Sequence, residues 1–217
     1  SALSKGKITP QSVLEFSAAG YVLGENTLYE DIKQVQAGEI VHIDKTQSSP
    51  KITTHRYYRY APTPLNNGKS EKDWEKELNQ VLDNIIDRMI KSIGDRPICV
   101  PLSGGLDSRL ILAKLCEHGV KNIHTFSYGL ENNFEAKTAK EVAHMLGVDW
   151  FMVPAQPNKA KALFDGEIRK QYADVAHGFS KIPSYVEFEA INTVTEKSLI
   201  PSNSVIINGQ SGDYISG

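Results

Sequence analysis

The sequence has few cysteines, no long apolar run and no large excess of charge of either sign. Its two cysteines in 217 residues cannot form a disulfide framework, and no apolar run approaches the roughly 18 residues that a membrane-spanning helix needs. The 24 Lys and Arg residues nearly balance the 26 Asp and Glu residues, which argues against a general binder of nucleic acids or anionic membranes. Residues 1–7 contain no apolar signal core. We therefore expect a cytoplasmic protein with reduced thiols and with no nucleic-acid or membrane partner.

The composition is that of an ordinary globular chain, with 40% hydrophobic and 23% charged residues. A stretch at residues 61–71 contains two prolines, a glycine and two asparagines, which is typical of a linker between domains. Residues 1–60 predict short strands and irregular structure, with strand-like runs at 20–24 and 38–43. We therefore expect a β-rich N-terminal part and a second domain over residues 72–217.

Residues 72–217 alternate between helical and strand-like segments. Apolar residues recur at spacings of three and four over residues 72–92, which predicts an amphipathic helix. Further helices are expected near 106–118, 135–146, 157–173 and 184–198, and strands near 97–102, 122–128, 150–153 and 205–208. Strands separated by single helices imply right-handed crossovers. The predicted fold class is therefore α/β, a parallel sheet with helices on both faces, whose ligands bind beyond the carboxyl ends of the strands.

The first predicted strand of this domain ends in Ser103-Gly104-Gly105-Leu106-Asp107-Ser108. The two glycines allow a tight turn and a close approach of the backbone to a ligand. The helix that begins directly after them points free N–H groups and its positive dipole end at the turn, which favours an anion. The serines add hydroxyl donors for phosphate oxygens. Asp107 would repel a phosphate, but it fits the site if Mg²⁺ lies between the carboxylate and the phosphates.

The loop matches neither of the common phosphate motifs, GxxxxGK[ST] and GxGxxG. It resembles the pyrophosphatase loop, SGGxDS, of the N-type ATP pyrophosphatases. Those enzymes cleave ATP between the α and β phosphates and form an adenylated substrate and pyrophosphate. The alternative is a loop at a helix N-terminus that binds no ligand. Five fixed positions, placed between a strand and a helix, favour the pyrophosphatase loop.

The sequences around the loop resemble the asparagine synthetase family. Residues 100–112 look like the family's strand, loop and helix, and residues 124–130 look like its second strand, whose end meets the adenine. Asn208-Gly209-Gln210-Ser211-Gly212-Asp213 resembles its second signature, S-G-E-G-x-D-E, and residues 20–43 resemble the last strands of its glutaminase domain. The resemblance implies an adenine nucleotide alpha hydrolase-like fold for residues 72–217, an ATP-pyrophosphatase synthetase domain incomplete at its C-terminus. Residues 1–60 would be the tail of a glutaminase-like domain of the N-terminal nucleophile type.

The resemblance also implies a role for each matching residue. Contacts with the nucleoside are expected from Leu102, Tyr128, Asn208 and Gly209. The pyrophosphate is expected to be held by Ser103, Gly104, Gly105, Asp107 and Ser108. Asp107 and Asp213 would hold Mg²⁺, and the expected catalytic residues are Asp107, Asp213 and Gln210. Two carboxylates from separate strand ends are hard oxygen ligands for such a cation, which would neutralise charge on the leaving pyrophosphate.

Three departures from the family's pattern bear on the activity. Glutamine hydrolysis in the family needs an N-terminal cysteine, whereas this chain starts at Ser1 and has its two cysteines far along the sequence. We therefore expect that this chain alone does not hydrolyse glutamine. Gln210 stands where the family has a glutamate, and Tyr214 replaces the second acid; because glutamine cannot exchange protons, the acceptor need not be aspartate. The chain also ends at Gly217, before the family's further helices and catalytic lysine.

Other residues near the loop have open roles. Arg109 replaces a usually small neutral residue, and it is either an extra phosphate or acceptor contact or a solvent-facing arginine on the first helical turn. His124 is either a proton donor near the site or a structural histidine, and the structural role is favoured. Cys99 and Cys116 are expected to be small buried apolar residues.

The resemblance implies an ATP- and Mg²⁺-dependent carbon–nitrogen ligase of the asparagine synthase (glutamine-hydrolysing) type. ATP would adenylate a carboxylate on a small-molecule acceptor, such as an acidic sugar. Ammonia, glutamine-derived nitrogen or another amine would then displace AMP. The alternatives are another pyrophosphatase-loop enzyme with a non-aspartate acceptor, and a nucleotide-binding protein that does no chemistry. A homodimer is one possible assembly.

Overall fold

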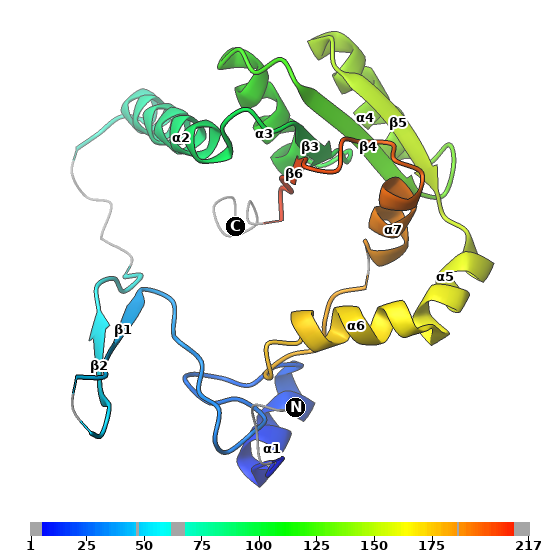
Figure 1. The fold of residues 1–217 in the computed structure, drawn as a ribbon. Helices are drawn as coiled ribbons and strands as arrows, with labels where there is room; N and C mark the ends of the chain where they lie inside the picture. Colours follow the sequence, from blue (N-terminus) through cyan, green and yellow to red (C-terminus); the bar gives the residue numbers. More distant parts are fainter. Residues whose placement is uncertain (1–5, 47, 62–67, 186, 211–217) are drawn as a thin grey trace. The chain divides into compact units, whose positions relative to one another are not determined.

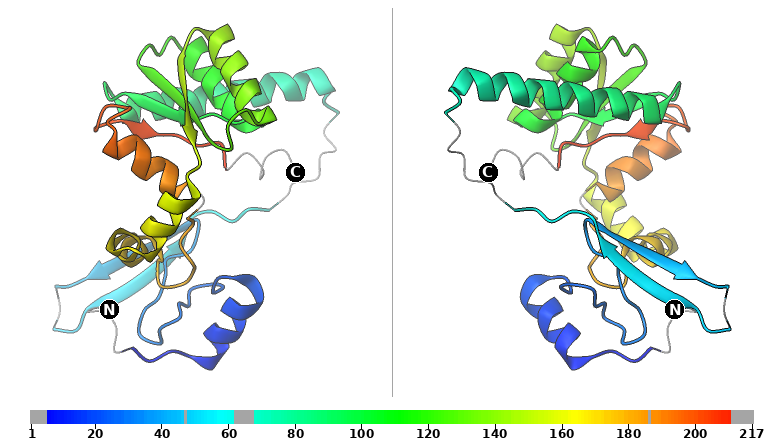
Figure 2. Two further views of the ribbon diagram at one scale, coloured as in Figure 1. Left: turned by 90° about the vertical axis from the view of Figure 1, so that its right-hand side faces the viewer. Right: turned by 90° about the vertical axis from the view of Figure 1, so that its left-hand side faces the viewer.

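The computed structural model describes residues 6–46, 48–61, 68–185 and 187–210. The chain divides into two compact units (Figures 1 and 2). The first unit comprises Ser1–Asn66 and Asp165–Ser184, and the second comprises Asn67–Phe164 and Tyr185–Gly217. The predicted phosphate loop therefore belongs to the second unit.

The second unit is built on a sheet of four parallel strands in the order β5-β4-β3-β6. The strands are β3 (Ile98–Pro101), β4 (Ile123–Gly129), β5 (Asp149–Pro154) and β6 (Val205–Ile206). In the register, Ile98 lies opposite both Ile123 and Val205. The chain runs outward from β3 to β4 and β5 and then returns to the other side of β3, so the strand order reverses between β3 and β6. In open parallel sheets the ligand crevice lies at such a reversal.

Helices cover both faces of this sheet (Figure 1). The unit's helices are α2 (Glu71–Ile93), α3 (Leu106–Glu117), α4 (Phe134–Leu146), α5 (Pro157–Asp165) and α7 (Phe188–Glu196). Successive residues of a strand point to opposite faces. Accordingly, Val100 of β3 belongs to a core cluster with α2, α3 and α4, and Cys99 belongs to another with α7. The predicted fold class, a parallel sheet with helices on both faces, is therefore confirmed.

Local sequence signals decide where the helices begin and end. Ser70 and Asp73 form a capping box at the start of α2, in which the side chain of each accepts a hydrogen bond from the backbone N–H of the other. Asn133 caps α4 by accepting from the Ala136 N–H at 2.7 Å. Gly147 ends α4 in the left-handed conformation, at φ 68°. The predicted bounds of these two helices, 72–92 and 135–146, agree with those of α2 and α4 to within one residue.

An ion-pair network joins α2 to α3. Asp83 Oδ1 lies 3.0 Å from Lys114 Nζ and 3.4 Å from His118 Nε2. Asp87 Oδ1 lies 2.9 Å from His118 Nδ1. The hydrogen bonds from Lys114 and His118 hold the pKa of Asp83 below its ordinary value. The network is exposed on the Asp83 side, so its contribution to stability is small.

The first unit combines a hairpin with helices and irregular loops. Its elements are α1 (Pro10–Ala19), β1 (Glu39–Asp44), β2 (Lys51–Arg56) and α6 (Glu167–Ala176). The strands β1 and β2 pair antiparallel. The β-rich structure predicted for residues 1–60 is therefore correct for the hairpin, but it misses α1. The missed signals are Thr9, whose side chain accepts from Ser12 N, and Gly20, which ends the helix in the left-handed conformation.

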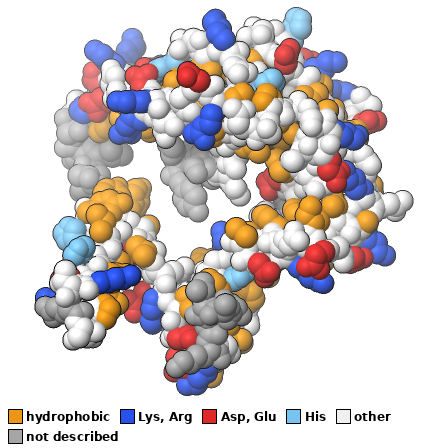
Figure 3. Space-filling view, viewed as in Figure 1, with side chains coloured by type: hydrophobic (Ala, Val, Ile, Leu, Met, Phe, Trp, Pro, Cys, Tyr) orange, Lys and Arg blue, Asp and Glu red, His pale blue; other side chains and the backbone are white. Residues whose placement is uncertain are grey.

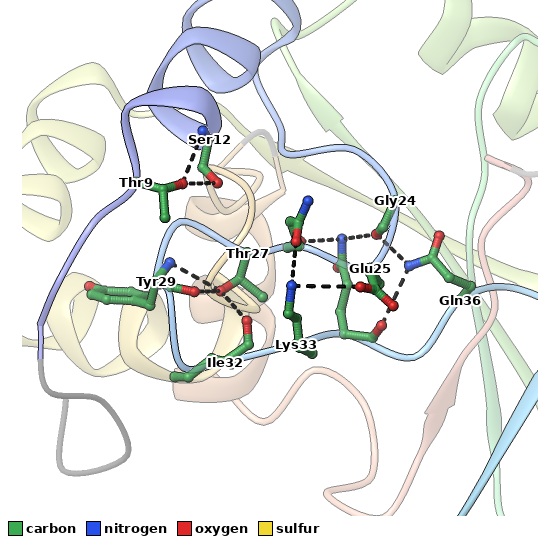
Figure 4. A network of polar contacts seen from close by, with 11 residues as sticks. Thr9, Ser12, Gly24, Glu25, Thr27, Tyr29, Ile32, Lys33 and Gln36 are labelled. Carbon is green, nitrogen blue, oxygen red and sulfur yellow. Dashed lines mark hydrogen bonds and ion pairs between the residues drawn. The ribbon is translucent and has the colours of Figure 1, made fainter. Parts of the chain in front are cut away.

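Polar side chains organise the loop that follows α1 (Figure 4). Thr27 Oγ1 donates to Ile32 O at 2.8 Å and accepts from Tyr29 N at 3.1 Å. The run at 20–24, which the sequence predicts to be strand-like, makes a single isolated bridge between Tyr21 and Lys181. Beside that bridge, the Val22 N–H donates to Ser180 O at 2.9 Å, so the run is held by isolated backbone bonds and side-chain bonds and not by a sheet.

The segment Asp165–Ser184 packs with the N-terminal residues. Leu28 N donates to Phe179 O at 2.9 Å, and the rings of Tyr29 and Phe179 meet edge-on with centroids 5.8 Å apart. The sequence assigns this segment to the domain at 72–217. The domain boundaries stay a prediction, and the contacts add that one later segment belongs with the first unit.

Apolar side chains are also exposed on the surface (Figure 3). On the hairpin, Ile40, Ile43 and Ile52 are between 50% and 66% exposed. Within the described residues, no helix combines the length and the apolar character that a bilayer crossing demands.

Replacing Leu112 of α3 by alanine should destabilise the core of the second unit. The side chain is fully buried in the cluster that joins α2, β3 and α4, so its truncation should lower the free energy of unfolding by about 2–5 kcal/mol. Urea denaturation followed by circular dichroism measures this loss. Leu110, on the same helix, is 44% exposed, and Leu110→Ala is the matched control. Equal losses for the two variants would contradict the core described above.

The Asp83 network should make stability depend on acid pH. Because the folded-state pKa of Asp83 is lowered, its contribution is present above the unfolded-state pKa, about 3.9, and is lost as the pH falls through the folded value. Asp83→Asn should therefore be less stable than the wild type at neutral pH, and the two should converge as the pH falls from about 5 to about 2. Thermal melts across this range measure the difference, with the exposed Asp95→Asn as the charge-matched control. A difference that stays constant with pH would rule out this role.

Candidate functional site

A cavity lies beyond the carboxyl ends of β3, β4 and β6, at the reversal of the strand order. Its volume is about 500 Å³, which is within the range of small-molecule sites. The lining comes from the turn after β3, the end of β4, the first turns of α4 and α7, and the segment after β6. All of these elements belong to the second unit.

The turn after β3 is held together by its own two serines. The Ser103 N–H donates to Ser108 Oγ at 3.1 Å, and the two hydroxyl oxygens lie 3.0 Å apart. The Gly105 N–H donates to Ser103 Oγ at 3.1 Å. Gly105 is also the N-cap of α3 and has no side chain with which to cap it. The positive end of the helix therefore opens onto the cavity, as in sites that bind phosphate or another anion.

Two glycines are required here by close backbone approach. A Cβ atom at Gly209 would lie 2.7 Å from Ser108 N and 2.9 Å from Asp107 Cβ, so the segment after β6 rests on the first turn of α3. A Cβ atom at Gly104 would lie 3.0 Å from Glu135 Cα, so the turn also rests on the first turn of α4. A larger residue at either position would separate the elements that enclose the cavity.

The lining also includes apolar side chains and a tyrosine–glutamate pair. Leu102, Ile191 and Ile206 contribute apolar surface. The Tyr128 hydroxyl donates to Glu187 Oε1 at 3.4 Å. Burial, and then the nearby Glu187 carboxylate, raise the pKa of Tyr128, so the hydroxyl keeps its proton and acts as a donor at neutral pH.

The charged side chains that line the cavity are acidic. They are Asp107, Glu135 and Glu187, and no Lys, Arg or His occurs among the described lining residues. A phosphate group in this cavity would therefore require a cation beside it. The part of the chain that the structure describes contains no cluster of three or more His, Cys, Asp or Glu side chains suited to a metal. Such a cation would take most of its ligands from phosphate and water, as Mg²⁺ commonly does.

The structure brings together most of the site residues expected from the sequence. Nine of them line this one cavity: Leu102, Ser103, Gly105, Asp107, Ser108, Tyr128, Asn208, Gly209 and Gln210. Gly104 lies in the same turn, against Glu135. Asp213 and Tyr214 lie outside the described residues. The roles assigned to these residues stay predictions.

Three other candidates lie outside the cavity lining. Arg109 Nε donates to Gly105 O at 3.0 Å, so the arginine braces the first turn of α3. His124 lies at the amino end of β4, opposite Asp149, whereas the cavity is at the carboxyl end. Cys99 is fully buried, and burial raises its pKa to about 11, in agreement with its interpretation as a small apolar residue.

The sequence analysis missed the residues that α7 and the turn before α4 add to the lining. Glu187 and Ile191 line the cavity from α7, and Asn133 lines it from the N-cap of α4. Asn133 had a detectable signal, because an asparagine before a helical pattern favours an N-cap. Glu187 had none, because its position depends on how α7 packs against the sheet.

Comparison with known proteins places the chain in the asparagine synthase family. The family model for asparagine synthase matches residues 77–217, a range that contains every lining residue of the cavity. A protein of Mycobacterium tuberculosis (strain ATCC 25618 / H37Rv), provisionally named asparagine synthetase (glutamine-hydrolyzing), is 25% identical over 157 residues, which cover 67% of this chain and 24% of that protein. The asparagine synthetase (glutamine-hydrolyzing) of Asparagus officinalis is 40% identical over 74 residues, 30% of this chain and 12% of the plant protein.

Among solved structures, an NH3-dependent NAD synthetase from Campylobacter jejuni subsp. jejuni NCTC 11168, in complex with the nitrate ion, has a TM-score of 0.42 and 14% identity. The match covers 62% of this chain and 56% of that chain. The stretch shared with the mycobacterial protein is about a quarter of that protein's length.

Gly209→Ala should disturb the backbone contact between the segment after β6 and the first turn of α3. Its Cβ would lie 2.7 Å from a backbone nitrogen, so the two segments must move apart, and the free energy of unfolding should fall by about 1–3 kcal/mol. The control is Gly105→Ala. That Cβ would meet only the Ser103 hydroxyl, at 3.2 Å, and the φ of −73° suits any residue. Urea denaturation measures both losses, and a larger loss for Gly105→Ala would contradict this backbone contact.

Proposed function

Because this chain belongs to the asparagine synthase family, we propose that it is an ATP-dependent carbon–nitrogen ligase that forms an amide from a carboxylate and a nitrogen donor. The observation that carries the proposal is the meeting of the turn Ser103–Ser108 with the segment Asn208–Gln210 around one cavity. They meet where the strand order reverses, which is where open parallel sheets bind nucleotides.

In this proposal the cavity holds ATP through backbone and hydroxyl groups. The pyrophosphate lies against the turn Ser103–Gly105, where the backbone N–H groups of the first turn of α3 and the hydroxyl of Ser108 can donate to it and the positive end of α3 offsets its charge. The nucleoside is contacted by four residues from strand ends: Leu102, Tyr128, Asn208 and Gly209. Asp107 lies beside the pyrophosphate and needs a cation between the two.

A Mg²⁺ ion fits the donors that the cavity offers. Asp107 supplies a hard carboxylate oxygen beside the turn, and the family resemblance adds Asp213, outside the described residues. Mg²⁺ usually binds through one or two carboxylates together with phosphates and water, so these donors suffice. When bound, it would neutralise the charge that develops on the leaving pyrophosphate.

The proposed reaction has two steps. An oxygen of the acceptor carboxylate attacks the α-phosphorus of ATP, the bond from that phosphorus to the α,β-bridging oxygen breaks, and pyrophosphate leaves. The nitrogen of ammonia or an amine then attacks the carbonyl carbon of the acyl adenylate, AMP leaves with the bonding electron pair, and the nitrogen loses a proton to solvent. The start of α3 acts by stabilising negative charge with its preorganised first-turn N–H groups.

Gln210 bears on which carboxylate is the acceptor. It lines the cavity at the position of the glutamate in the family signature, and it cannot exchange a proton. We therefore propose a small carboxylate other than aspartate, such as an acidic sugar, with ammonia or glutamine-derived nitrogen as the second substrate. A homodimer and a cytoplasmic location stay predictions.

Titration of Mg²⁺-ATP into the 217-residue chain by calorimetry tests the nucleotide site. Asp107→Asn should weaken binding by roughly tenfold or more, because a charge-assisted contact is worth about 1.5–3 kcal/mol. Asp149→Asn is the matched control, since Asp149 is exposed at the amino end of β5, and it should bind as the wild type does. Equal affinities of all three proteins for Mg²⁺-ATP would show that Asp107 is not part of the nucleotide site.

Product analysis separates the candidate functions. With ATP, Mg²⁺, ammonia and a panel of small carboxylates, the chain should release AMP and pyrophosphate in a reaction that depends on Asp107. ADP as the nucleotide product would refute the proposed chemistry. ATP binding without AMP release from any acceptor would favour the second candidate, a nucleotide-binding protein without catalysis, which the presence of Gln210 motivates.

A further inference from the structure

Glu187 and the turn Ser103–Ser108 line the cavity from opposite faces of the sheet. Glu187 precedes the first residue of α7, which packs on its face of the sheet through Ala190 and Val194. The helix α3, which follows the turn, packs on the other face through Leu112. Ile191, one turn into α7, also lines the cavity. The turn and Glu187 therefore approach a bound molecule from different sides of the sheet.

The hydroxyl of Tyr128 orients the Glu187 carboxylate. It donates to Glu187 Oε1 at 3.4 Å, and burial keeps it protonated by raising the pKa of Tyr128. An ionised carboxylate only accepts hydrogen bonds, and its two oxygens offer about four lone-pair positions. Glu187 can thus accept from a ligand in addition to the bonds it makes within the protein. The ligand group that it suits is a hydrogen-bond donor, either N–H or O–H.

Tyr128 lies at the nucleoside end of the proposed ATP site, so its partner Glu187 lies at that end as well. Leu102 and Ile206 bring apolar surface to the same cavity from the ends of β3 and β6. A planar base fits both the apolar and the acidic part of this lining. Its faces can lie against the apolar side chains, and an exocyclic amino group can donate a hydrogen bond to the carboxylate. Adenine carries such an amino group at C6, whereas a 6-oxopurine has a carbonyl oxygen in its place.

We propose that Glu187 is a specificity-determining residue that selects adenine over 6-oxopurines by accepting a hydrogen bond from the amino group at C6. The 6-oxo oxygen of inosine or guanine would face the carboxylate with its lone pairs, so the two groups would form no hydrogen bond with each other. This inference rests on the proposed nucleotide site. It adds the residue that distinguishes adenine from other purine bases.

The test compares the affinities for Mg²⁺-ATP and Mg²⁺-ITP by calorimetry. The wild type should bind ATP about 10–100-fold more tightly than ITP, the range of one hydrogen bond to a charged group. In Glu187→Gln the side-chain amide can donate to the 6-oxo oxygen, so the ratio of the two affinities should fall by about tenfold or more. The control is Glu141→Gln, on the exposed side of α4 and outside the cavity lining, which should keep the wild-type ratio.

A second variant guards against a change in folding. Glu187 makes no side-chain capping bond at the start of α7, and Glu187→Gln keeps an acceptor for the Tyr128 hydroxyl, so Glu187→Gln should leave the melting temperature close to that of the wild type. Glu187→Ala removes the acceptor without adding a donor and should bring the two affinities close together. An unchanged ratio in these variants, with ATP binding still dependent on Asp107, would overturn the role of Glu187 and leave the proposed function standing. Failure of the wild type to bind ATP would overturn both.

Discussion

The close approach of Gly209 to the first turn of α3 is the contact on which the site depends. β6 pairs with β3 at only two residue positions, so its ladder alone places the following segment weakly. The missing side chain at Gly209 lets the backbone lie where a Cβ would be 2.7 Å from Ser108 N. Asn208 and Gln210 thereby reach the cavity that the turn after β3 begins. Gly104 makes the same kind of joint with α4, so the enclosure is set by backbone contacts that leave no room for a side chain.

The electrostatics of this cavity combine two opposing tendencies. The open start of α3 attracts an anion, whereas Asp107, Glu135 and Glu187 repel one. The two are compatible when a cation lies between a carboxylate and a phosphate, or when a carboxylate faces a hydrogen-bond donor. The first arrangement is our proposal for Asp107 at the pyrophosphate, and the second is our proposal for Glu187 at the base. Family membership supports the use of ATP, and the acidic lining explains why the ATP would need a metal.

The sequence predicts best those features that depend on interactions between residues close together in the chain. The bounds of α2 and α4 are predicted well because apolar residues recur along α2 and Gly147 ends α4, and both signals are local. The helix α1 is missed although Thr9 and Gly20 mark its ends, because strand-like runs dominate the pattern of residues 1–60. The packing of Asp165–Ser184 with the N-terminal residues has no local signal, since it depends on contacts such as that of Leu28 with Phe179.

The sequence by itself determined the alternation of helices and strands, the phosphate turn with its two glycines, and the resemblance that a family model then supported. These features depend on periodicity, caps and short motifs, all of which act over a few residues. Only the tertiary structure decided that nine of the expected residues share one cavity, that Arg109 and His124 stay outside its lining, and that Glu187 and Ile191 join it. The order of the strands and the packing of α7 on the sheet make those decisions. Both features bring together residues that are far apart in the chain. The contacts between such residues leave no signal in the local sequence.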